Sequence, residues 1–389
     1  MKISFLRVGV LIAVITAVSM SFIGTEIWGF YGHRLINRTA VFTLPVELIP
    51  LFKSNIDYIT EQSVAPDKRR HASPLEAIRH YIDIDHWGEE DINTVPRDIA
   101  KAMFKYGGLF VLNSKQDTVE KWDTERKYNS LSDSLAPYVI HEISRQSNEV
   151  MESGSVEIPI RWLESEYPSG AKLYFEDHFS SFGILPYNLL MYQKRLENAF
   201  QKKEWTLVLR LSAEIGHYIS DAHVPLHTTE NYNGQMTGQK GIHAFWESRL
   251  PELFAEGEYD LFTGRAKYIE NMDDFIWKIV NDSHALVDEV LGKEKELSLS
   301  FDRDKQFCFE FRGAQQVRQA CEGYARAYQQ AMNDMVENRM RASIAAVGSI
   351  WYTSWVNAGR PIIDQNDILN LNELQIDSTQ MIGEHQEVK

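Results

Sequence analysis

Residues 211–252 read LSAEIGHYISDAHVPLHTTENYNGQMTGQKGIHAFWESRLPE and hold four of the twelve histidines of the chain. His217 and Asp221 are four residues apart, and so are His243 and Glu247. Residues four apart lie on one face of a helix, one turn from each other. Each pair can therefore present two metal-binding atoms in one direction.

His227 follows Pro225, a residue type that ends helices, and can turn back towards the second pair. Imidazoles with carboxylates are a ligand set that suits zinc. One such pair is usually a surface pair, but two pairs and a further histidine in one short stretch predict a metal site. His223 is six residues from His217, well off the shared face at about 100° per residue, so we expect it to be structural or solvent-facing.

The composition limits the class of protein. The chain has 389 residues, of which 44% are hydrophobic and 12% aromatic, which is enough for a sizeable core. A net charge of −15 argues against nonspecific nucleic-acid binding through a broad basic surface, but not against a phosphate held by local metal ions. The only cysteines, Cys308 and Cys321, exclude a disulfide scaffold and a cysteine zinc site, and leave open a single bridge between them.

Apolar residues recur at helical spacing along much of the chain, with no internal repeat and no block of strands. The sequence therefore predicts an all-α fold, a single multi-helix domain with the metal cluster in a cleft between helices. Residues 154–175 are expected to be irregular because Pro159 and Pro168 interrupt them. The expected helices outside the quoted stretch are 34–42, 48–60, 133–153, a long amphipathic helix after residue 175, 273–291 and 315–355.

The two ends of the chain differ from the middle. Lys2 and Arg7 precede an apolar run, so residues 1–27 are predicted to be a signal peptide, with an N-terminal membrane anchor as the alternative. A signal peptide would make the protein exported, either periplasmic or extracellular. Residues 28–358 would form the helical domain, and residues 359–389 a polar C-terminal tail.

An ordered set of motifs resembles a known family. The motifs are WGFYGH (28–33), Asp67 with HYID (80–83), HYISDAHVPLH (217–227) and IHAFWESRLPE (242–252). Together they are similar to the trinuclear-zinc phosphoesterases, which include bacterial zinc-dependent phospholipases C and single-strand-specific zinc nucleases. The resemblance implies a zinc-dependent phosphodiesterase with up to three Zn²⁺ ions.

The resemblance also implies a ligand for each ion. Ile27 is a poor residue for signal-peptidase cleavage, so cleavage can leave a few residues ahead of Trp28. Trp28 would then lack the free amine that the third zinc needs. Asp67, His80, His217 and Asp221 would hold a first zinc; His227, His243 and Glu247 a second; and Trp28, through its amino group and carbonyl oxygen, with His33 and Asp221, a third.

The implied reaction is attack of a metal-activated water on a phosphodiester, with Asp67 as the catalytic residue that orients or deprotonates the water. The substrate is a phospholipid or a single-stranded nucleic acid, and the motifs do not separate these two.

We expect a monomer with no stable macromolecular partner. The alternatives are a di-iron carboxylate bundle, which uses Glu-x-x-His motifs not found at the key positions, and a non-catalytic exported metal-binding protein on the same fold.

Overall fold

The structure is a computed structural model that describes residues 30–70, 72–87, 94–115, 117–122, 135–159, 170–312 and 315–364. The predicted signal peptide, Trp28 and residues 365–389 lie outside the described residues, and the predicted domain boundaries stay predictions. Among the described residues, none of the helices combines the length and the apolar character needed to cross a membrane.

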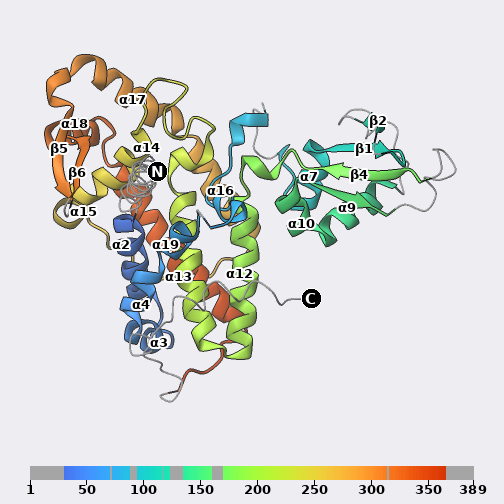
Figure 1. Ribbon diagram of the computed structural model, residues 1–389. Helices are drawn as coiled ribbons and strands as arrows, with labels where there is room; N and C mark the ends of the chain where they lie inside the picture. Colours follow the sequence, from blue (N-terminus) through green and yellow to red (C-terminus); the bar gives the residue numbers. More distant parts are fainter. Residues whose placement is uncertain are drawn as a thin grey trace, which may run out of the picture.

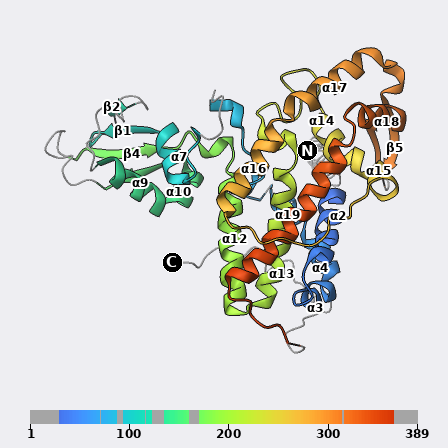
Figure 2. The same ribbon diagram turned by 180° about the vertical axis from the view of Figure 1, so that it is seen from behind.

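A bundle of helices forms the body of the molecule (Figure 1). Seen from behind, α19 runs obliquely across α12, α13 and α2, and it packs against all three (Figure 2). The helices of the body are α2 (Phe30–Ala40), α3 (Ile49–Ser54), α4 (Ile56–Gln62), α5 (Ala65–Arg69), α6 (Pro74–Ala77), α12 (Leu185–Lys202), α13 (Trp205–Ala222), α14 (Ile242–Ala244), α15 (Leu250–Glu258), α16 (Met272–His284), α17 (Val287–Ser300), α18 (Glu322–Ala331) and α19 (Met335–Asn357).

Helix α13 is the central element of the body. It is buried around most of its circumference, as expected of a helix that is surrounded by others. Gly216 lets α2 approach closely, because a Cβ there would collide with the side chain of Asn37. Asn37 in turn donates a hydrogen bond from Nδ2 to the Ala213 carbonyl at 2.9 Å. This close crossing brings His33 on α2 next to His217 on α13, with ring centroids 4.0 Å apart.

A four-stranded antiparallel sheet projects from the body as a separate lobe (Figure 1). Alternate residues such as Leu109, Val111, Leu173 and Phe175 are buried, which is the period of two expected of a half-buried strand. The strands are β1 (Gly108–Leu112), β2 (Thr118–Trp122), β3 (Ser155–Ile158) and β4 (Lys172–Glu176) in the order β2-β1-β4-β3, with α7 (Ile99–Tyr106), α9 (Leu135–Arg145) and α10 (Ser147–Ser153) in the same lobe.

A two-stranded ribbon lies at the opposite edge of the molecule, near α18 (Figures 1 and 2). It consists of β5 (Phe307–Arg312) and β6 (Gln315–Ala320), which pair antiparallel. A disulfide joins Cys308 to Cys321 at the base of the ribbon, so the bridge that the sequence left open is formed.

The prediction of an all-α fold is therefore wrong as stated, although the chain is mostly helical. Strands such as GLFVL are only five residues long, too short to separate from a buried helical segment by periodicity alone. Residues 154–175, expected to be irregular, contain β3 and the start of β4, and the helix expected over 315–355 begins with β6. The helix expected over 48–60 is divided at Asn55 into α3 and α4, and 273–291 spans parts of α16 and α17.

Candidate metal centre

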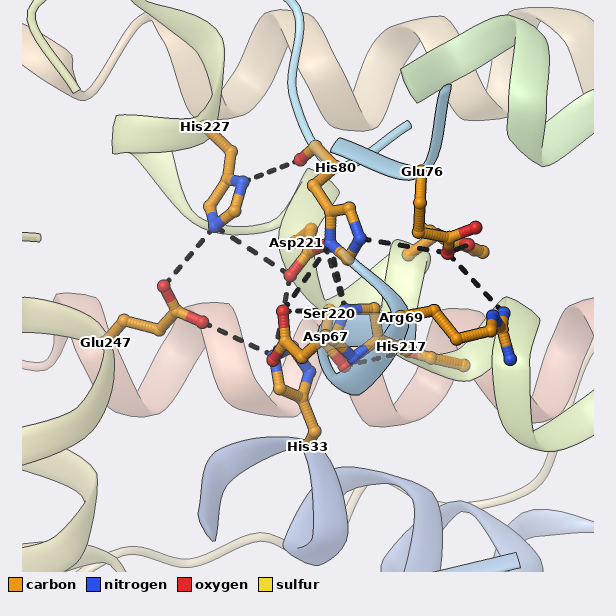
Figure 3. Close-up of polar contacts among 12 residues, drawn as sticks. His33, Asp67, Arg69, Glu76, His80, His217, Ser220, Asp221, His227 and Glu247 are labelled. Atoms are coloured by element: carbon orange, nitrogen blue, oxygen red, sulfur yellow. Dashed lines mark hydrogen bonds and ion pairs between the residues drawn. The ribbon is translucent and has the colours of Figure 1, made fainter. Parts of the chain in front are cut away.

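Side chains from distant segments of the chain converge at the C-terminal end of α13. They come from α2, α5, the loop after α6, α13 itself and the elements that follow it: η5 (Pro225–Thr228), α14 and the π-helical turn η6 (Phe245–Arg249). Figure 3 shows several of their polar ends turned towards the carboxylate of Asp221. Most of these side chains are buried, and sets of three of them could each hold a metal ion.

The first group consists of Asp67, His80, His217 and Asp221. His80 Nδ1 lies 2.9 Å from Asp221 Oδ2 and 3.8 Å from Asp67 Oδ1. His217 Nε2 lies 3.3 Å from Asp221 Oδ2, 3.7 Å from Asp67 Oδ1 and 3.1 Å from His80 Nδ1. A tetrahedral site with bonds of about 2.0–2.2 Å places its ligand atoms about 3.3–3.6 Å apart. The five observed separations lie around these values, and Asp67, His80 and His217 together form a group that could hold one metal ion.

The second group consists of His227, His243 and Glu247. Glu247 Oε2 lies 3.3 Å from His227 Nε2 and 2.7 Å from His243 Nε2. The three side chains offer ligand atoms that lie within 4.8 Å of one another. Glu247 belongs to a π-helical turn, a distortion that is frequent at functional sites.

His33 connects the two groups. Its Nε2 lies 3.5 Å from Asp221 Oδ1, 3.4 Å from Glu247 Oε1 and 4.0 Å from Asp67 Oδ2. Asp221 thus presents Oδ2 to the first group and Oδ1 to His33, while Glu247 presents one oxygen to His33 and the other to the second group. Carboxylates arranged in this way can bridge neighbouring metal ions.

The charges in the cluster stabilise one another in the absence of metal. Burial alone raises the pKa of Asp221, but His217 and His227 hold that pKa well below its ordinary value. Burial alone lowers the pKa of His217, but Asp221 and Asp67 raise it to about 9. Burial likewise raises the pKa of Glu247, and His243 with its other imidazole neighbours brings it well below the usual range. The carboxylates of Asp221 and Glu247 are therefore ionised and available to bind a cation.

Backbone hydrogen bonds fix the ring of His227 and join its segment to that of His80. His227 Nδ1 lies 2.6 Å from the His80 carbonyl, and the amide of Ile82 donates to the His227 carbonyl at 2.9 Å. Because a carbonyl only accepts, the proton of a neutral His227 is on Nδ1, which leaves the Nε2 lone pair facing Glu247. This is the tautomer that a metal-binding imidazole requires.

Glu76 belongs to a polar network behind the cluster that sequence reasoning missed. Its side chain accepts a hydrogen bond from the Tyr218 hydroxyl and pairs with Arg79 at 2.9 Å. It also pairs with Arg69 at 3.4 Å (Figure 3). Glu76 Oε1 also lies 3.9 Å from His80 Nε2, the nitrogen that points away from the cluster. The signal was present, because Glu76 and His80 have the same four-residue spacing as the two pairs in 211–252.

The structure brings together all of the predicted ligands except Trp28, which lies outside the described residues. Asp67, with 23% of its side chain exposed, is more accessible than His217 or Asp221, so it lies on the open side of the cluster. His223 is buried, and its Nδ1 donates to the Ile219 carbonyl at 2.8 Å. It is thus a structural histidine, one of the two expectations from sequence.

A comparison of the sequence with models of known protein families and with curated proteins finds no match.

Proposed function

We propose that the chain is an exported zinc-dependent phosphodiester hydrolase of the trinuclear-zinc phosphoesterase type. The observation that carries the proposal is the sharing of Asp221 between the first group and His33, because a carboxylate with one oxygen on each side suits adjacent metal ions. The ordered motifs of the sequence support the same assignment. The donors are imidazoles and carboxylates, with no thiolate among them, and this set suits zinc.

The buried positions of the ligands support metal binding over a simple network of ion pairs. Side chains of His33, His80, His217 and Asp221 are almost completely buried and crowd their polar atoms together. Buried charges of this density are normally paired or coordinate metals. When bound, clustered zinc ions would lower the pKa of a water molecule towards neutrality and stabilise negative charge on a phosphoryl oxygen.

We assign the roles of proton acceptor, anion binding and substrate stacking to different residues of the chain. Asp67, on the accessible side, would orient an attacking water and accept its proton. Burial lowers the pKa of His227, Asp221 and Glu247 raise it above its ordinary value, and the positive charge of Arg70 opposes them; we assign the Arg70 guanidinium to the attraction of an anionic phosphodiester. Tyr232, half exposed and 5.9 Å from the His243 ring, offers an aromatic wall for a base or a head group.

The chemistry can be tested separately from the substrate. Purified protein should contain zinc by elemental analysis and should hydrolyse the soluble ester bis(p-nitrophenyl) phosphate in a chelator-sensitive reaction. His217→Ala should lose metal and activity together, whereas His178→Ala, which changes an exposed histidine of the sheet lobe, should keep both. If His217→Ala retained full zinc and full activity, the site assignment would be wrong.

Further assays distinguish the two candidate classes of natural substrate. Cleavage of single-stranded DNA would favour the nuclease branch, and hydrolysis of phosphatidylcholine vesicles the phospholipase C branch. Zinc bound without hydrolysis of any of the three substrates would favour the non-catalytic metal-binding protein, and bound iron would favour the di-iron alternative.

A further inference from the structure

The β5–β6 ribbon carries three phenylalanines on one face. Phe307, Phe309 and Phe311 alternate along β5, so their side chains point to the same side. Their exposed fractions are 38%, 65% and 75%, which increase along the strand away from the disulfide. We call this side of the ribbon the aromatic face; it also includes Arg318 and Gln316, the cross-strand partners of Phe309 and Phe311.

The opposite side of the ribbon is fixed to the body. Glu310 accepts from Arg249 Nη2 at 2.6 Å, and Arg249 Nε donates to the Ala320 carbonyl at 3.1 Å. With Cys308 bonded to Cys321, the ribbon is held in place while its phenylalanines point outwards. A rigid element that keeps large apolar side chains in water indicates an interaction surface, because the largest exposed apolar patch of a soluble protein is often functional.

The size of the aromatic face argues against a second copy of the chain as its occupant. A phenylalanine buries about 150–250 Å² when fully covered, so the exposed parts of the three rings amount to roughly 350 Å². A stable protein interface needs about 800 Å² on each partner. A lipid bilayer has no such minimum, since each ring that enters the interfacial region contributes by itself.

The charge on the face fits a phospholipid. The Arg318 guanidinium lies 3.7 Å from the centroid of the Phe307 ring and is exposed. A cation beside aromatic rings matches the boundary of a bilayer, where phosphate groups lie above the acyl chains. We propose that the aromatic face docks on a phospholipid surface, with the phenyl rings at the acyl boundary and Arg318 at a lipid phosphate.

Docking would bring the bilayer to an element that contacts the segment of the metal ligands. Arg249, which holds the ribbon, is two residues after Glu247 on the same π-helical turn. The inference does not depend on the proposed function, because the ribbon can bind a membrane whether or not the metal centre is catalytic. It would nevertheless make a lipid the more accessible of the two substrates.

The test measures sedimentation of the full chain with phosphatidylcholine vesicles, with and without phosphatidylglycerol. Phe309→Ser with Phe311→Ser should reduce the partition coefficient at least ~10-fold, because two rings no longer leave water. Phe262→Ser is the matched control, since Phe262 is 78% exposed in the loop after α15 and should leave binding unchanged. Arg318→Gln should weaken binding to the vesicles that contain phosphatidylglycerol more than binding to phosphatidylcholine alone.

Hydrolysis of bis(p-nitrophenyl) phosphate separates this inference from the proposed function, because the double variant should keep it at the native rate. Failure of the native protein to sediment with either vesicle would overturn the inference, and so would equal sedimentation of the native protein and the double variant. A dimer in analytical ultracentrifugation that the double variant abolishes, without vesicle binding, would instead assign the aromatic face to a second copy.

Discussion

His80 and Asp221 are 141 residues apart in the sequence, and His80 Nδ1 lies 2.9 Å from Asp221 Oδ2. The contact joins the loop after α6 to the C-terminal end of α13. The other oxygen of Asp221 lies 3.5 Å from His33 Nε2 on α2. One carboxylate thus holds together three segments of the chain, and its removal should affect more than one metal ion.

Asp221→Asn tests this sharing. The amide keeps the size of the side chain but removes the negative charge, so we expect the loss of more than one zinc ion per chain and a fall in phosphodiesterase activity of at least ~100-fold. Metal content by mass spectrometry after dialysis is the measurement. Asp282→Asn, which removes an exposed partner of Lys278, is the control and should retain all of the metal. Loss of a single ion would show that Asp221 binds only one.

Glu76→Gln should weaken metal binding without touching a ligand. Glu76 lies behind His80 Nε2, and carboxylates in this position orient imidazole ligands and raise their basicity. We expect a ~10–100-fold lower zinc affinity, measured by competition with a chelating dye, and denaturation with urea should check that the variant is folded. Glu197→Gln, which changes a carboxylate on α12 that pairs with Lys194, is a matched control. An unchanged zinc affinity would limit the role of Glu76 to pairing with Arg69 and Arg79.

Arg70→Gln should affect substrate binding more than chemistry. If Arg70 attracts the phosphodiester, KM should rise ~10-fold while kcat changes little, since the interaction is present before and during the reaction. The KM of the native enzyme should also rise with salt concentration because screening weakens this attraction. Lys194→Gln removes an exposed positive charge on α12 and should change neither constant. A variant with an unchanged KM and a lower kcat would place Arg70 in the chemical step instead.

The pKa of His217, raised to about 9, predicts a pH dependence for the metal-free protein. An imidazole with a raised pKa in the folded state stabilises the fold fully below its unfolded value of about 6.5, and this contribution is lost as the pH rises towards 9. The free energy of unfolding of chelator-treated protein should therefore fall over this window, by on the order of 3 kcal/mol at most.

Urea denaturation at several pH values measures this fall. His217→Gln should flatten the dependence between pH 7 and 9, and added zinc should remove it, because a metal-bound imidazole is already deprotonated. A metal-free protein that becomes more stable between pH 7 and 9 would contradict the assignment of a paired, charged His217.

The sequence was most informative where the ligands are local. The pairs His217 with Asp221 and His243 with Glu247 follow from helical spacing, and the structure places both in the cluster. His33, Asp67 and His80 come from distant segments, so spacing alone could not select them, and the resemblance supplied them. Their convergence depends on tertiary packing such as the contact of Gly216 with Asn37.

The sheets were harder to predict than the site. The strands of the lobe are four or five residues long, and although β1 and β2 form a local hairpin, the sheet is completed by the pairing of segments far apart, β1 with β4. Helical periodicity carries no information about such pairings. In β5, the sequence FCFEFR does alternate, but its apolar side faces outwards, so burial cannot be the reason for the pattern.

The disulfide gives a last prediction, about the independence of the ribbon. Replacing both Cys308 and Cys321 by serine removes a bridge across 13 residues, which in the chain-entropy model costs about 3 kcal/mol. We expect a lower Tm and faster proteolysis within β5–β6, with unchanged zinc content, because none of the metal ligands lies on the ribbon. Reduction of the native protein should have the same effects. Loss of zinc on reduction would instead show that the contact of Arg249 with Glu310 transmits disorder in the ribbon to Glu247.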